Sequence, residues 1–103
     1  MKDISEVTDL MAELLENNVD YETTVFTERG REIINEISDF AEQTRIFKDN
    51  KEKGEMFDGS TVRQIFGYML DRIVNAPTFI HRDMSIILIM PFVRRKLQEE
   101  ENQ

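Results

Sequence analysis

Apolar side chains recur along this chain at spacings of three and four residues, which is the period of an amphipathic α-helix. The first apolar stripe follows Asp3 and Glu6, a pair typical of the capping box that begins a helix. Thr27 and Thr78 stand where later stripes begin, and we expect them to cap those helices. The pattern predicts an all-α fold, a compact bundle of four to five helices over residues 4–17, 28–47, 61–75, 79–90 and 91–99.

Two segments between these stripes lack the helical period. Residues 19–26 are rich in β-branched and aromatic side chains, but a single short strand would have no partner, so we expect an ordered connection. Its Tyr21, Val25 and Phe26 are expected to pack inward. Residues 48–59 are polar and contain two glycines, which predicts a mobile loop.

The last third of the chain contains the most informative apolar run. Residues 86–90 are all apolar and would cover every face of a helix, so they require burial at the bundle centre or partly in an interface with a second chain. Pro91 must then kink the helix or open a fifth one. Ser60 or Asp58 is expected to cap the helix before this region, and the acidic tail 99–103 is expected to fray.

Composition narrows the classes of function. The 103 residues fit one helical domain, 1–103, and their net charge of −8 is uneven. Residues 1–60 carry 7 Lys/Arg against 16 Asp/Glu, net −9, whereas residues 61–103 carry 6 against 5, net +1. This field disfavours direct nucleic-acid binding and favours a protein partner with a basic or mixed-charge surface. The absence of cysteine, of a signal peptide and of a membrane-length apolar run predicts a cytoplasmic protein without membrane contact.

The sequence contains no strong catalytic or ligand-binding motif. His81 is the one histidine, and Asp83 would orient it only if the backbone geometry allowed, so we do not predict a catalytic pair. The carboxylates at helical spacing lack the Glu-x-x-His motif of a di-metal bundle, and no glycine pattern for phosphate binding occurs. We therefore expect no enzyme activity, no metal and no cofactor.

The sequence is interpreted as a non-catalytic, protein-binding regulator or adaptor that acts stoichiometrically, for instance as a phage or mobile-element accessory inhibitor of a host enzyme. Two alternatives stay open: an acidic mimic of nucleic acid that blocks a DNA- or RNA-binding enzyme, and a homo-oligomeric structural or assembly protein, such as a homodimer. The expected contacts are an acidic helix face, two apolar loop residues and a basic triplet: Glu28, Glu32, Glu36 and Asp39; Met56 and Phe57; Arg94, Arg95 and Lys96.

Overall fold

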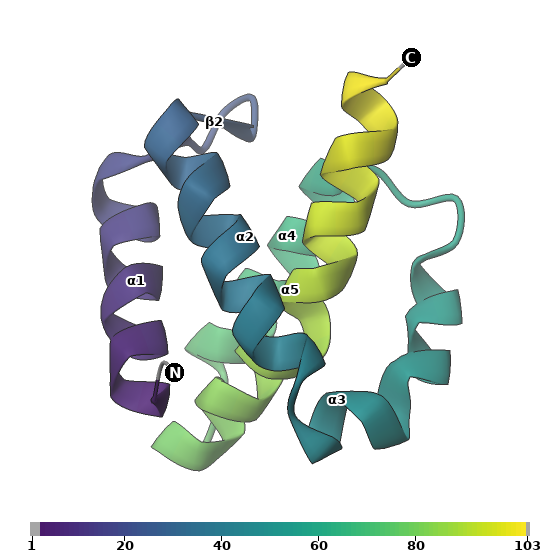
Figure 1. Ribbon diagram of the computed structural model, residues 1–103. Coiled ribbons are helices and arrows are strands. Elements are labelled where there is room, and N and C mark those ends of the chain that lie inside the picture. The colour runs from purple at the N-terminus through teal and green to yellow at the C-terminus, as the bar shows by residue number, and fades with distance from the viewer. Residues whose placement is uncertain (1–2, 103) are drawn as a thin grey trace.

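The computed structural model describes residues 3–102, and within them the predicted all-α bundle is confirmed (Figure 1). A two-stranded hairpin and one 3-10 helix accompany the α-helices. In chain order the elements are α1 (Ile4–Asn17), β1 (Val19–Asp20), β2 (Val25–Phe26), α2 (Glu28–Glu42), α3 (Arg45–Asn50), the 3-10 helix η1 (Lys51–Phe57), α4 (Val62–Val74) and α5 (Phe79–Glu101).

Side-chain caps fix the starts of the helices. In α1, α2 and α5 the capping side chain accepts a hydrogen bond from a backbone N–H three residues later, and the capping residues are the predicted Asp3, Thr27 and Thr78. Helix α4 is capped by Thr61 instead of Ser60 or Asp58. Thr61 forms the reciprocal capping box with Gln64, which satisfies two backbone donors at once.

Residues 19–26 form a small antiparallel hairpin, so the expectation that a strand here would lack a partner was wrong. Val19 pairs with Phe26 because the four residues between the strands turn the chain back on itself, with Thr24 at a φ of 55°. Phe26 packs inward as predicted. Tyr21 and Val25 do not, since they are 55% and 58% exposed.

The predicted helix 28–47 is broken near its end. Thr44 donates its hydroxyl hydrogen to the Ala41 carbonyl and accepts a hydrogen bond from the Phe47 N–H, so it ends α2 and caps α3. The prediction of a loop over residues 48–59 was also wrong, because α3 and η1 occupy most of this segment.

Helix α5 runs through the middle of the bundle and packs against both α2 and α4, while α1 covers α2 (Figure 1). Four residues of the apolar run 86–90 are buried and Leu88 is partly buried, which confirms central burial. Pro91 is buried inside α5, and the helix continues through it with a change of direction, so no separate fifth helix begins there. No described helix has both the length and the apolarity that crossing a bilayer requires.

The acidic end of α5 is held against the bundle. A Glu100 carboxylate oxygen accepts a hydrogen bond of 2.8 Å from the Val62 N–H at the start of α4, and Glu101 lies 2.8 Å from the Arg31 guanidinium of α2. The described part of the acidic tail is thus helical up to Glu101 and contacts both α2 and α4. The final residue of that tail, Gln103, lies outside the described residues.

Candidate functional site

The acidic face of α2 is partly neutralised by an arginine from its own first turn. Arg29 lies 2.8 Å from Glu13 of α1, 3.4 Å from Glu32 and 3.8 Å from Glu36. The hydrogen bond with Arg29 lowers the pKa of Glu13, and the same bond raises the pKa of Arg29. Two predicted contact residues, Glu32 and Glu36, thus surround one guanidinium, whereas Glu28 lies exposed at the start of the helix.

Asp39 and Arg94, predicted as parts of separate surfaces, are partners. The Arg94 side chain is 16% exposed, and its nitrogens lie 2.6 Å from Asp39 and 3.0 Å from Glu42. Burial acts to lower the pKa of Arg94, but hydrogen bonds to the two carboxylates leave it raised. This cluster ties α2 to α5, which is a structural role.

The other two members of the basic triplet are also engaged. The guanidinium of Arg95 lies over the Phe92 ring, 5.1 Å from its centroid, and 4.0 Å from Asp58. Lys96 lies 3.0 Å from Glu99 one turn further along α5. The triplet points in different directions and presents no continuous basic surface.

Met56 and Phe57 separate in the structure. Phe57 is buried, with its ring centroid 5.6 Å from that of Tyr68 and 5.7 Å from that of Phe92. Met56 is 59% exposed and lies at the edge of a groove. Of this predicted pair, Met56 is the side chain that a partner can reach.

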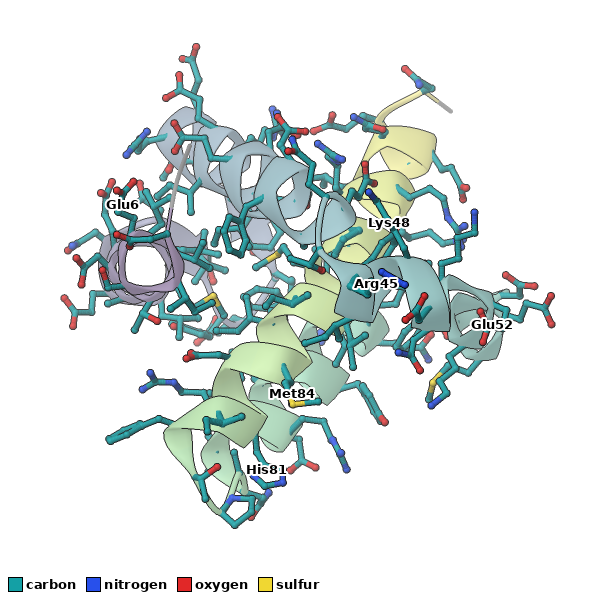
Figure 2. The ribbon with its side chains drawn as sticks, turned by 60° about the horizontal axis from the view of Figure 1, so that its bottom comes forward. Glu6, Arg45, Lys48, Glu52, His81 and Met84 are labelled. Carbon is teal, nitrogen blue, oxygen red and sulfur yellow. The ribbon has the colours of Figure 1, made fainter. Side chains whose placement is uncertain are left out.

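This surface groove follows the junction of α4 and α5 and was not predicted from the sequence. It consists of a hollow of 270 Å³ beside η1 and a hollow of 230 Å³ nearer the α4–α5 turn, and both are lined by Arg72, Ser85 and Leu88. We call it the α4–α5 groove. Figure 2 views the first turns of α5, where His81 and Met84 line the second hollow, with Glu52 of η1 to one side.

A second unpredicted surface lies at the same end of the molecule. Val74 ends α4, Phe79 and Ile80 begin α5, and these three side chains are 81%, 76% and 71% exposed. The Arg82 guanidinium stacks on the Phe79 ring, 4.8 Å from its centroid. We call Val74, Phe79 and Ile80 the apolar tip. The apolar pattern alone does not distinguish these residues, because two helix neighbours about 100° apart can face one core, as the buried Ile65 and Phe66 do.

His81 and Asp83 do not face each other. The His81 ring nitrogen Nδ1 lies 2.7 Å from the Thr78 hydroxyl, whereas Asp83 pairs with Arg82 and accepts a hydrogen bond from Thr8. Across residues 3–102 no three His, Cys, Asp or Glu side chains are grouped so that they could hold a metal ion.

Comparison with known proteins gave no relative: no family model, no curated protein and no solved structure matches this chain.

Proposed function

We propose that this protein is a non-catalytic binding module that acts stoichiometrically on a protein partner, as a regulator or adaptor in the cytoplasm. The observation that carries the proposal is the apolar tip. Single exposed apolar residues are common on protein surfaces, but several that flank one turn, beside polar groups, are typical of interaction sites. The rim here includes Arg82, which already stacks on Phe79.

Burial of the apolar tip by a partner would contribute a substantial hydrophobic free energy of binding. Full burial of a Val, Ile or Phe side chain stabilises by roughly 1.5–3 kcal/mol, so covering the three mostly exposed tip residues is worth roughly 4–6 kcal/mol. That amount compares with a total folding stability of about 5–15 kcal/mol for a domain. A partner that covers the tip recovers this hydrophobic free energy, less the entropy lost on association.

The acidic field directs the choice of partner. The net charge of −8 favours approach by a basic or mixed-charge surface, and salt screens this attraction. The nucleic-acid mimic is less favoured, because Glu32, Glu36 and Asp39 lie against Arg29 and Arg94 of the same chain, which weakens a phosphate-like array.

The test compares partner capture by the intact chain with capture by a tip variant, Val74→Ser/Phe79→Ser/Ile80→Ser. The matched control, Ile4→Ser/Val25→Ser, removes exposed apolar side chains elsewhere. We expect the tip variant to lose the partner and the control to retain it, with both giving wild-type circular dichroism. Equal capture by all three proteins would contradict the proposal.

Self-association is tested on the same proteins. Sedimentation at micromolar concentration should give the monomer mass of 12.2 kDa. If the wild type is a dimer and the tip variant is a monomer, the partner of the tip is a second copy of the chain. The proposal of an adaptor would then give way to that of a homo-oligomer.

A further inference from the structure

The α4–α5 groove has the form of a binding surface for one additional helix. Helix α5 lines it with His81, Ser85, Leu88 and Phe92, and helix α4 lines it with Tyr68 and Arg72. Both sets follow the three- and four-residue spacing of a single helix stripe. Parallel stripes on two adjacent helices are the surface against which a third helix packs in a bundle.

The groove is lined by cations without partners in an acidic protein. Lys53 and Arg72 are the charged side chains of the hollow beside η1, and within residues 3–102 neither forms an ion pair. Lys48, Lys51 and Arg63 also form no ion pair among the described residues, but they line neither hollow, whereas Lys53 and Arg72 line the same one. Asp71, the carboxylate of the second hollow, accepts a hydrogen bond from the Asn75 amide.

The shape of the groove favours an elongated ligand such as a peptide, because its hollows of 270 and 230 Å³ follow one another along α5 and share Arg72, Ser85 and Leu88. Along α5 the groove extends from His81 to Phe92, about 16 Å at 1.5 Å per residue, which equals three turns of a bound helix. Met56 and Met84 at its edges are flexible apolar side chains that adapt to varied partner surfaces.

We propose that the α4–α5 groove binds an acidic amphipathic helix of a partner protein. Its apolar face, with anchors at i, i+4 and i+7, packs on Tyr68, Leu88 and Phe92, and its flanking carboxylates pair with Lys53 and Arg72. The tip residues line neither hollow, so this site is separate from the surface that carries the proposed function.

The test uses purified full-length protein and a displayed library of random peptides of about 14 residues, enough for roughly four helical turns. Selected peptides are synthesised with a fluorescent label, and their Kd is measured by anisotropy. The groove variant is Lys53→Glu/Arg72→Glu. The matched control, Lys48→Glu/Arg63→Glu, makes the same change of net charge at two cations that line neither hollow and form no ion pair among the described residues.

We expect the selected peptides to be net acidic with helical apolar spacing, and the groove variant to weaken their binding by roughly tenfold or more. The control should bind within about twofold of wild type at about 150 mM salt, where charges more than about 8 Å apart are largely screened. Selection of basic or non-periodic peptides, absence of any selected peptide, or equal weakening by both variants would overturn the proposal. The tip variant should bind these peptides normally, so failure here is distinct from failure of the proposed function.

Discussion

Gly54 of η1 lies directly against the ring of Phe92. An ideal Cβ at position 54 would lie 2.8 Å from Phe92 Cδ1 and closer still to Cε1 and Cζ, so alanine cannot be added without a shift. The Phe92 ring is itself confined by Phe47 and Phe57, with centroids 5.6 and 5.7 Å away. The φ of Gly54 is not positive, so Gly54→Ala introduces no left-handed backbone strain, and steric overlap is the source of its expected loss of stability.

The expected loss of stability follows from the displacement of the Phe92 ring. Forcing one extra methyl group into a packed core costs about 1–3 kcal/mol, and complete loss of a buried Phe side chain costs about 3–5 kcal/mol. Displacement of the Phe92 ring falls between these limits, so we expect Gly54→Ala to destabilise by about 2–3 kcal/mol. For a domain of this size, that lowers the Tm by roughly 8–20 °C.

A matched control gives the opposite sign. Gly67 lies in the interior of α4, and a Cβ there would have no neighbour within 4 Å. Gly67→Ala therefore gains helix propensity of about 0.8–1 kcal/mol without a clash. The same chemical change should raise the Tm at position 67 and lower it at position 54.

Urea unfolding followed by circular dichroism gives the free energy of unfolding and its denaturant dependence for each variant. A Phe92→Leu background removes the clashing ring atoms, so Gly54→Ala should cost less there than in the wild type. The steric argument would be refuted by a Gly54→Ala protein within about 0.5 kcal/mol of wild type, or by an equal loss in both backgrounds.

Three further predictions follow from individual contacts. Ser38 is fully buried and its hydroxyl has no hydrogen-bond partner among the described residues, so Ser38→Ala should stabilise by about 1 kcal/mol in urea unfolding; a loss would indicate an undetected partner. A Cβ at Gly30 would lie 2.7 Å from the Asn18 carbonyl oxygen, so Gly30→Ala should separate α2 from the hairpin, cost about 1–3 kcal/mol and shift the hairpin amide resonances. Because Arg29 lowers the pKa of Glu13, their pairing stabilises the fold above the ordinary carboxylate pKa and is lost as the pH falls through the lowered one. The Tm of wild type should thus fall more than that of Arg29→Met between neutral pH and about pH 3; parallel curves would exclude a contribution from the pair.

The helix starts could be predicted because capping is local. Asp3, Thr27 and Thr78 each bond a backbone group only three residues away, so the sequence around each position contains the whole interaction. The all-α class followed from the apolar period in the same way. The hydrogen bonds of Thr44 are also local, but a threonine within an apolar stripe is compatible with a continuous helix as well as with a helix end. The sequence alone does not distinguish these two cases.

Two features of the fold depend on long-range packing. The sequence leaves open whether Pro91 kinks a helix or begins one, and in the structure Pro91 lies within one continuous α5, where its neighbours Met90 and Phe92 are also buried. Residues 48–59 form helical turns because Gly54 and Phe57 are buried against α5, a contact about 35 residues distant in sequence. Neither contact is visible in a local window.

The ion pairs of the predicted contact residues were likewise not predictable from the local sequence. Glu32, Glu36 and Asp39 form an acidic stripe in the sequence, but their partners Arg29 and Arg94 reach them only through the geometry of the folded helices. An acidic stripe in a sequence therefore indicates the sign of the long-range electrostatic field. It does not show which carboxylates are available to pair with a partner.

The two surfaces proposed for binding lie along α4 and α5. Helix α4 packs principally against α5, so much of its surface is not used by the core, and both the groove and the tip involve it. Among the described residues Arg72 forms no ion pair although carboxylates exceed cations in the sequence, and Val74 remains 81% exposed. On the α1–α2 side, Glu13, Glu32 and Glu36 already share the Arg29 guanidinium, so a cation of a partner must compete with it, at a cost of up to about 1 kcal/mol per exposed pair. Binding at the α4–α5 side requires no such exchange, which is why the proposed contacts lie there.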